Sequence, residues 1–586
     1  MTIMKFASWG LLLGSAAARA TFQPYNGVDD LGARALLPRN ASFWGDIVAT
    51  KVAARDALIP AEYLVPQDML PDPSVDDISA FPFTSGLFTD LELEITESTA
   101  SEVVKRVACG DWTAEEVLEA TIKRAVVAQQ LFNPLSEILF ERGRAQAKKL
   151  DAYFAETGKT MGPLHGLPIS LKDQFRFKGV DATIGYVSWA NRPAEKDSLT
   201  VTALEELGAV LWVKTNIPTS LMSGETINNI FNETKNPFNR RLTPGGSSGG
   251  ESSLVGFHGS FIGFGTDIAG SIRIPCTNTG LWCVRPSIGR CSYENLANSL
   301  RGEEAITSTC GPMGRSPDDL KLVFSSLVNK GLWEDDPNTI PMPWREDKEQ
   351  LPEKLVFGWA NGDGHVQPWP PVQRGMLETK AKLEAAGHEV VEWLPPSWYE
   401  HNTQMQNLFS VDGHLDIQTD FNASGEPFLP TIASYLAWVA PEDRPTVYES
   451  WQLVQVLQNY TQSFRDAWQG SANITSTGRP IDALIMPATS NVAKERGIAY
   501  PYGYGNLSPM LDLTTGVFPV TRTNSSIDVV NATFVPLNDA DAKNQALYDD
   551  PTTWEHAPVG LQLIGRRLEE EKIVAMLKVI ELALKA

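Results

Sequence analysis

The sequence predicts an α/β fold in which helices cover both faces of a β-sheet. Apolar runs of strand length alternate along the chain with amphipathic stretches, and this alternation is typical of layered α/β domains. In the stretch before Gly387, helical spacing ends at a glycine and a strand-like run follows directly. The predicted strands lie at 167–171, 209–213, 261–264, 355–357, 388–393 and 483–486.

Helix start signals indicate where the main domain begins. Two S/T-x-x-E capping boxes, each ahead of an apolar-periodic stretch, occur at Thr99 with Glu102 and at Thr113 with Glu116. We therefore place the main domain at 91–586. The Pro-rich, weakly periodic residues 21–90 are interpreted as an N-terminal arm rather than an independent domain. The last helix is predicted from about Leu568 to the C-terminus.

The composition describes a large, acidic, soluble globular protein. The 586 residues contain 49 Lys and Arg against 71 Asp and Glu, a formal charge of −22, with 42% hydrophobic and 20% charged residues. A surface of this sign repels the phosphates of nucleic acids and anionic membranes. We therefore expect neither nucleic acid nor membrane as a partner.

The first twenty residues have the pattern of a secretory signal peptide. A short start containing Lys5 leads into an apolar run at 6–18, and residues 18–20 match an A-x-A cleavage site. The run is too short to span a bilayer, which takes about 20 apolar residues. We therefore predict a secreted protein whose signal peptide is 1–20. Secretion in turn predicts N-glycans at the Asn-x-Ser/Thr sites Asn40, Asn232, Asn422, Asn459, Asn473, Asn506, Asn524 and Asn531.

Cysteine and histidine usage predicts neither a disulfide scaffold nor a metal site. The five cysteines are an odd number and sparse, so at most two bridges form and the fold does not depend on them. No C-x-x-C or H-E-x-x-H pattern occurs, and the seven histidines are scattered.

A glycine- and serine-rich run at 243–276 is the strongest functional signal. Glycine this dense requires a positive φ or a close approach of the backbone to a ligand. A flexible linker does not fit, because the apolar run 261–264 and a second Gly-rich turn with Asp267 and Arg273 lie within it. A phosphate-binding loop does not fit either, because no lysine follows the glycine pair at 249–250.

Two serine nucleophiles remain open. Residues 246–250 match the G-x-S-x-G elbow with Ser248 as nucleophile, which requires a later Asp or Glu and a histidine, for which His556 is best placed. The other hypothesis is a serine activated by a lysine. Ser271 could then be the nucleophile, and Lys172, which closes the strand predicted at 167–171, the base. Desolvation at such a position lowers a lysine pKa and allows the neutral amine to accept a proton.

The run from Gly245 to Cys276 resembles the signature of the amidase signature family position by position. Residues 162–173 look like the lysine segment of that family, and 558–567 look like its C-terminal block. The resemblance covers roughly 90–586, is closest to fungal acetamidase-type members, and implies a single large domain with a mixed central sheet covered by helices on both faces. The matching residues include Gly245, Gly246, Ser247, Ser248, Gly249, Gly250, Gly265, Asp267, Ser271, Arg273 and Pro275.

The resemblance implies an amidase that hydrolyses a carboxylic acid amide to the acid and ammonia or an amine, without metal or organic cofactor. It implies Ser271 as nucleophile, Ser247 as bridging serine after a cis Gly246–Ser247 peptide, and Lys172 as base. An acyl-enzyme forms on Ser271. The other implied roles are an oxyanion hole from the N–H groups of Ile268, Ala269, Gly270 and Ser271, a hydrogen-bonding neighbour in Ser248, and support of the loop by Asp267 and Arg273.

Three alternatives to this reading are retained. They are a serine esterase using Ser248 and His556, an ammonia-delivering amidotransferase subunit, and an inactive binding protein on the same scaffold. The expected partner is a small-molecule amide, and a homodimer is a further option. Aromatic and apolar residues are candidates for the wall of the acyl pocket, although such residues more often lie in the core. The candidates are Met222, Trp282, Trp438 and Trp451.

Overall fold

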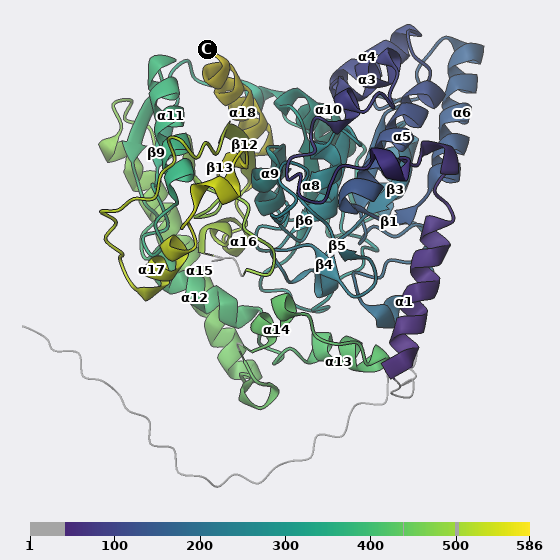
Figure 1. Cartoon of the computed structure of the whole chain (residues 1–586). Coiled ribbons are helices and arrows are strands. Elements are labelled where there is room, and N and C mark those ends of the chain that lie inside the picture. Colours follow the sequence, from purple (N-terminus) through teal and green to yellow (C-terminus); the bar gives the residue numbers. More distant parts are fainter. Residues whose placement is uncertain (1–40, 438, 499–502) are drawn as a thin grey trace, which may run out of the picture. The chain divides into compact units, whose positions relative to one another are not determined.

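The computed structural model describes residues 41–437, 439–498 and 503–586 (Figure 1). The predicted signal peptide, the first part of the predicted arm, Asn40 and Trp438 lie outside the described residues. The described residues, from Ala41 onward, belong to one compact unit.

The described residues form an eleven-stranded mixed sheet, which confirms the predicted fold class. Its strand order is β1-β3-β2-β6-β8-β7-β12-β13-β11-β9-β10, and β4 and β5 form a separate two-stranded ribbon. The strands are β1 (Leu135–Ile138), β2 (Pro168–Lys172), β3 (Val210–Thr215), β4 (Ile227–Asn228), β5 (Asn232–Glu233), β6 (Ile262–Asp267), β7 (Trp282–Arg285), β8 (Thr309–Gly314), β9 (Val356–Trp359), β10 (Glu389–Glu392), β11 (Ala483–Pro487), β12 (Thr515–Arg522) and β13 (Pro558–Ile564).

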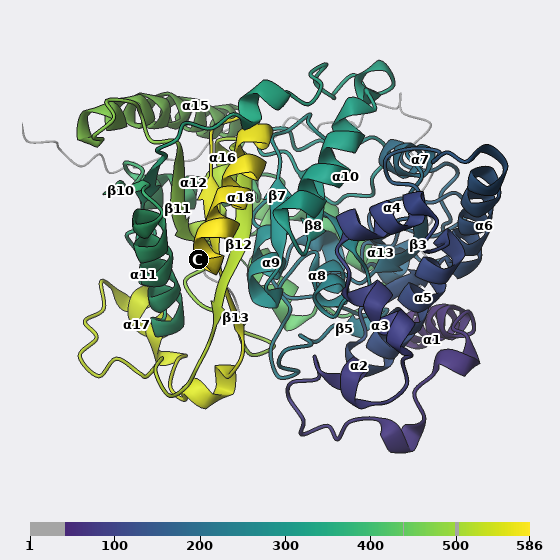
Figure 2. The same ribbon diagram turned by 90° about the horizontal axis from the view of Figure 1, so that it is seen from above.

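Helices alternate with the strands along the chain and cover both faces of the sheet (Figure 2). They are α1 (Ala41–Asp56), α2 (Phe81–Thr84), α3 (Asp90–Glu97), α4 (Ala100–Cys109), α5 (Ala114–Phe132), α6 (Phe140–Thr157), α7 (Leu199–Glu206), α8 (Gly249–Gly256), α9 (Arg273–Thr279), α10 (Pro317–Asn329), α11 (Pro370–Ala385), α12 (Trp398–Leu408), α13 (Leu415–Ser424), α14 (Pro430–Leu436), α15 (Val447–Gly470), α16 (Leu507–Met510), α17 (Asp539–Ala546) and α18 (Glu570–Lys585).

Side-chain alternation along the strands assigns the helices to the two faces. Leu211, Leu561 and Leu563 share one core with residues of α7, α10, α11 and α18. Trp212 points to the other face, where it packs on Phe140 of α6. Gln562 also points to that face and accepts a hydrogen bond from the first residue of α9. Two layers of helices therefore enclose the sheet.

The register of the central strands brings two distant segments together. β2 and β6 are parallel neighbours, with Leu171 opposite Phe264. Lys172 and Thr266 therefore lie at the same edge, where both strands end at their carboxyl termini. This is the edge at which open α/β sheets bind ligands.

The predicted helix starts are confirmed in part. Thr113 and Glu116 form a full capping box at α5. Thr99 accepts the N–H of Glu102 at the start of α4, but the Glu102 side chain does not return the bond. The last helix begins at Glu570, two residues after the predicted Leu568.

One disulfide joins Cys291 to Cys310, and the other three cysteines are free. This agrees with the expected limit of two bridges. Within the described ranges, no helix is long and apolar enough to cross a membrane.

Candidate active site

Lys172 is the last residue of β2, and its side chain is completely buried beside Ser247. Its Nζ lies 2.8 Å from Ser247 Oγ, 2.7 Å from Thr266 Oγ1 and 3.4 Å from Thr266 O. Among the described residues, no carboxylate lies within 4.0 Å of this amine. Burial lowers the pKa of Lys172 to about 7, although the more distant charges of Asp267 and Glu251 oppose the shift. A large neutral fraction is therefore present near pH 7.

The glycine-rich run bends tightly around this lysine. The Gly246–Ser247 peptide is cis, as the resemblance implies. Gly245 has a φ of 91°, and a Cβ on Gly246 would lie 2.5 Å from the carbonyl oxygen of Ser223. The positive φ at Gly245 confirms one of the two reasons expected for glycine here, and at Gly246 the close neighbour is another backbone segment of the chain rather than a ligand. The turn holds the Ser247 hydroxyl against the amine.

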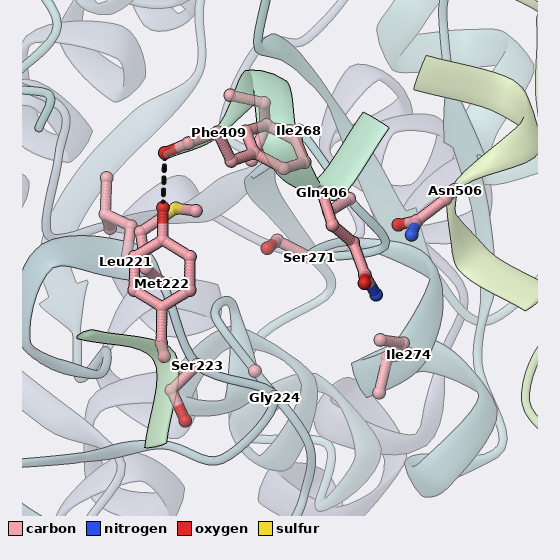
Figure 3. A pocket seen from close by; sticks show the side chains of 13 residues that line it. Leu221, Met222, Ser223, Gly224, Ile268, Ser271, Ile274, Gln406, Phe409 and Asn506 are labelled. Carbon is pink, nitrogen blue, oxygen red and sulfur yellow. Dashed lines mark hydrogen bonds between the residues drawn. The ribbon is translucent and has the colours of Figure 1, made fainter. Parts of the chain in front are cut away.

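Ser271 lies on the wall of a pocket close to this pair. The backbone links it to the glycine run, because Ser248 N donates to Ser271 O at 3.1 Å. Its side chain is 9% exposed, and Figure 3 shows its hydroxyl pointing into the pocket. Among the described residues, its Oγ has no hydrogen-bond partner. The structure thus joins Lys172 to Ser247 directly and places Ser271 nearby without a direct bond to Ser247.

Asp267 and Arg273 form a buried pair that fixes the loop before Ser271. Arg273 donates from Nε to Asp267 Oδ2 and from Nη2 to Oδ1, both at 3.0 Å, and the Asp267 carboxylate also accepts the N–H groups of Gly270 and Ile272. Burial raises the pKa of the Asp267 carboxyl, but the charge and hydrogen bonds of Arg273 outweigh burial and hold it at about 2. The predicted role in supporting the loop fits these contacts.

The Gly270 N–H does not have its predicted role. It donates to Asp267 Oδ1 at 2.8 Å, so it is engaged with the carboxylate instead of facing an oxyanion. Among the described residues, the N–H groups of Ile268, Ala269 and Ser271 have no acceptor. The predicted oxyanion hole therefore has three available donors rather than four.

Replacing Arg273 with methionine should lower the free energy of unfolding by about 3–5 kcal/mol, because Asp267 would stay buried without a partner. The pKa of an unpaired buried carboxyl rises, so the folded variant takes up a proton that the wild type does not. The deficit should then be larger at pH 8 than at pH 5. Urea unfolding at both values measures it.

Arg566→Met is the matched control for this loss. Arg566 pairs with Glu569 at the surface, so this variant should lose at most about 1 kcal/mol. Equal losses for the two variants would contradict the structural role given to Arg273.

The pocket beside Ser271 is partly open to solvent, and its empty volume, including the open mouth, is about 490 Å³. Its walls come from the loop at 221–224, the Ser271 loop, α12 and α14 with the segment between them, and the start of α16 (Figure 3). Tyr435 donates to the carbonyl oxygen of Phe409 and so ties α14 to the segment after α12. The lining residues are Leu221, Met222, Ser223, Gly224, Gly246, Ile268, Ala269, Ser271, Ile274, Gln406, Phe409, Tyr435 and Asn506.

Two of the four candidates for the pocket wall do not line the pocket, in line with the expectation that such residues more often lie elsewhere, mainly in the core. Met222 does line it. Trp282 is buried in the main core against Phe518, and Trp451 is 67% exposed on α15. Trp438 lies outside the described residues.

The Ser248 alternative has no base beside it among the described residues. Ser248 is completely buried, and in this part of the chain its hydroxyl has hydrogen-bond contacts only with the backbone of Thr266, at 3.4–3.5 Å. The side chain of His556 is 60% exposed, and its acidic neighbour is Glu555 at 3.9 Å. The two residues are therefore not brought together, and Ser248 is a hydrogen-bonding neighbour, as the resemblance implies.

Sequence reasoning missed three residues that line or support the site. Thr266 contacts Lys172, and Gln174 contacts Thr266. Asn506 was predicted to carry a glycan, but it is buried in the pocket wall and donates to Asn402, so that prediction is wrong. The other predicted glycosylation sites among the described residues are exposed. The side-chain oxygen of Asn506 is buried without a partner in the described chain.

Comparison with known proteins decides the family. The family model described as Amidase matches residues 116–574. The chain belongs to the amidase family. The amidase is 40% identical to an acetamidase of Emericella nidulans, covering 91% of this chain and 97% of the relative. It is 38% identical to an acetamidase of Aspergillus oryzae, covering 91% and 97%.

The amidase also resembles a solved structure of a fatty acid amide hydrolase. The TM-score is 0.88 at 30% sequence identity, with coverage of 93% of this chain and 97% of that one. The enzyme is an amide hydrolase of the amidase signature family, as the sequence predicts. In the described parts of the amidase, no group of three or more His, Cys, Asp or Glu is arranged to hold a metal ion.

Proposed function

We propose that this amidase cleaves amides through Ser271, Ser247 and Lys172 with an acyl-enzyme on Ser271. The observation that carries the proposal is the buried lysine amine, held 2.8 Å from Ser247 Oγ without a carboxylate partner. An amine in this state can accept a proton, which an ion-paired lysine cannot do. Ser271 lies next to it on the pocket wall.

The first half of the reaction forms the acyl-enzyme. Ser271 Oγ turns about its Cα–Cβ bond toward Ser247 and gives up its proton while Ser247 passes its own proton to Lys172 Nζ. Ser271 Oγ then bonds to the amide carbon, and the carbonyl oxygen becomes an oxyanion. The N–H groups of Ile268, Ala269 and Ser271, which have no acceptor among the described residues, can stabilise it, and in other hydrolases one such donor contributes about 2.7–4 kcal/mol to transition-state stabilisation.

The second half releases the products. Lys172 returns its proton through Ser247 to the leaving nitrogen, the C–N bond breaks, and ammonia or an amine departs. Water then loses a proton along the same route and attacks the ester carbon, which frees the acid and restores Ser271. Each proton therefore passes through these three side chains, toward the leaving nitrogen when the C–N bond breaks and away from water when the ester is hydrolysed.

The pocket favours a compact amide with an apolar acyl part. Leu221, Met222, Ile268 and Phe409 supply apolar wall, and the unpartnered oxygen of Asn506 can accept a substrate N–H. The acetamidase names of two relatives support a short acyl chain. We therefore propose short aliphatic or aromatic primary amides as substrates.

Labelling with a fluorophosphonate tests the nucleophile directly. We expect a single adduct on the peptide containing Ser271, located by mass spectrometry, and its formation should be slowed by a short primary amide. An adduct on Ser248 would overturn the proposal. Free ammonia released from such an amide by the isolated chain would also exclude an ammonia-delivering subunit that needs a partner.

We further propose that the enzyme is secreted. The Cys291–Cys310 bridge supports this, because disulfides persist mainly in oxidising compartments. Exposed Asn-x-Ser/Thr sites such as Asn232 and Asn459 support it as well. Residues 1–20 remain predicted as the signal.

A further inference from the structure

Gln174 is buried two residues beyond Lys172, and its side-chain amide has a single allowed orientation. Its Nε2 lies 2.7 Å from the carbonyl oxygen of Ala297 and 2.9 Å from the hydroxyl of Tyr293. A carbonyl oxygen can only accept, so the atom facing Ala297 must be the N–H₂ group. The Gln174 backbone is held at the same place, because Ala297 N donates to Gln174 O at 2.9 Å.

This orientation aims the side-chain oxygen of Gln174 at Thr266. Gln174 Oε1 accepts a short hydrogen bond from Thr266 Oγ1. An amide oxygen carries no proton, so the single hydroxyl proton of Thr266 must point to Gln174. Thr266 Oγ1 therefore has only lone pairs left for its other neighbours, Lys172 Nζ at 2.7 Å and the Tyr293 hydroxyl.

Proton counting then determines how the neutral lysine is oriented. A neutral amine has two N–H bonds and one lone pair. Thr266 Oγ1 and Thr266 O can both only accept, and both lie within hydrogen-bond distance of Lys172 Nζ. Both N–H bonds are thereby used, and the lone pair faces the remaining neighbour, the Ser247 hydroxyl at 2.8 Å.

We propose that Gln174 is a positioning residue that, by holding the hydroxyl proton of Thr266, turns the lone pair of Lys172 toward Ser247. The proposal rests on the Ser271–Ser247–Lys172 mechanism proposed above. Gln174 touches neither substrate nor the reacting atoms and acts only through Thr266. Without it, the Thr266 hydroxyl could rotate, donate to the Lys172 lone pair and compete with Ser247 for the base.

A double-mutant cycle tests whether Gln174 acts on Lys172 through the hydroxyl proton of Thr266. Gln174→Met keeps the side-chain length and removes the acceptor, so kcat on a short amide should fall about 10- to 100-fold, a part of what a general base contributes. KM should change little, because Gln174 does not line the pocket. In a Thr266→Val background there is no hydroxyl proton to place, so Gln174→Met should reduce kcat by no more than about twofold further.

Matched variants separate positioning from damage to the fold. Thr266→Ser keeps the hydroxyl and should keep the full Gln174→Met effect. Tyr293→Phe removes one acceptor of Gln174 Nε2 and the hydroxyl's contact with Thr266. It leaves Ala297 O to orient Gln174 and Gln174 Oε1 to accept the Thr266 proton, so its kcat should stay within about threefold of wild type. Gln174→Glu keeps an acceptor and adds a negative charge, so the acid limb of the kcat profile should move to higher pH. The other charged groups near Lys172, Asp267 and Glu251, are unchanged in all of these variants.

The outcomes distinguish this proposal from the mechanism on which it rests. Additive losses in the cycle, or loss of the Gln174→Met effect in the Thr266→Ser background, would overturn the positioning role even with the fluorophosphonate adduct on Ser271. An adduct elsewhere would overturn the mechanism itself. If Gln174→Met does not fold, the kcat–pH profile of Gln174→Glu tests the proposal instead. An acid limb at the same pH as in the wild type would then count against it.

Discussion

Ser271→Ala should lower kcat/KM for a short amide by about 10⁴- to 10⁶-fold, the loss typical when a serine nucleophile is removed. The reason is the position of the Ser271 hydroxyl. Ser271 directly follows the loop 268–270, whose free N–H groups can stabilise an oxyanion, and the other described hydroxyls on the pocket wall do not. Steady-state ammonia release measures the effect. Thermal unfolding should be nearly unchanged, because Ser271 Oγ has no partner among the described residues.

Ser248→Ala is the matched control, since it removes the same atoms from the neighbouring serine. Ser248 Oγ makes only long contacts with the backbone of Thr266, so activity should stay within about tenfold of wild type. The reverse pattern, with Ser248→Ala inactive and Ser271→Ala active, would favour the G-x-S-x-G hypothesis over the lysine-activated serine.

Lys172→Met should lower kcat by about 10²- to 10⁴-fold, because it removes the proton acceptor for Ser247 and keeps the buried volume. In the wild type, only the neutral amine is active. Burial holds the pKa of Lys172 at about 7, so kcat/KM should rise as pH increases from 6 to 8 and then level off.

The pH profile gives this prediction a second readout. The residual activity of Lys172→Met should lack the rise near pH 7, because the titrating amine is gone. An unchanged rise in that variant would assign the titration to another group. Lys123→Met serves as a surface control, since Lys123 pairs with Glu92 on the outer helices and should leave both rate and profile unaltered.

Much of the site follows from local sequence. The glycine-rich run predicts special backbone geometry. In the structure, Gly245 has a positive φ, and Gly246 packs closely against the backbone of Ser223. Lys172 was recognised from its place at the end of an apolar strand. Thr266 and Gln174 gave no such signal, because a threonine in a strand and a glutamine after one are ordinary residues until their partners are known.

The same limit applies to the fold. The six strands predicted from apolar runs all exist, with ends that differ by at most three residues. β8 was missed because Thr309–Gly314 contains two glycines and a proline, which indicate a turn when read alone. It is a strand because β6 and β7 supply hydrogen-bond partners on both sides, with Gly265 opposite Gly311.

By itself, the sequence determined the fold class and the helix cap at Thr113, because short-range spacing encodes these features. The resemblance to a family then implied the candidate residues for the chemistry. Tertiary structure alone decided that Gly270 N–H serves Asp267, that Asn506 belongs to the pocket, and that Gln174 reaches Thr266. The last two depend on segments that are distant in the chain, and the first on how a loop folds back on a buried carboxylate. A hydrogen bond needs its donor and acceptor within about 3 Å, and only the packed chain sets that distance.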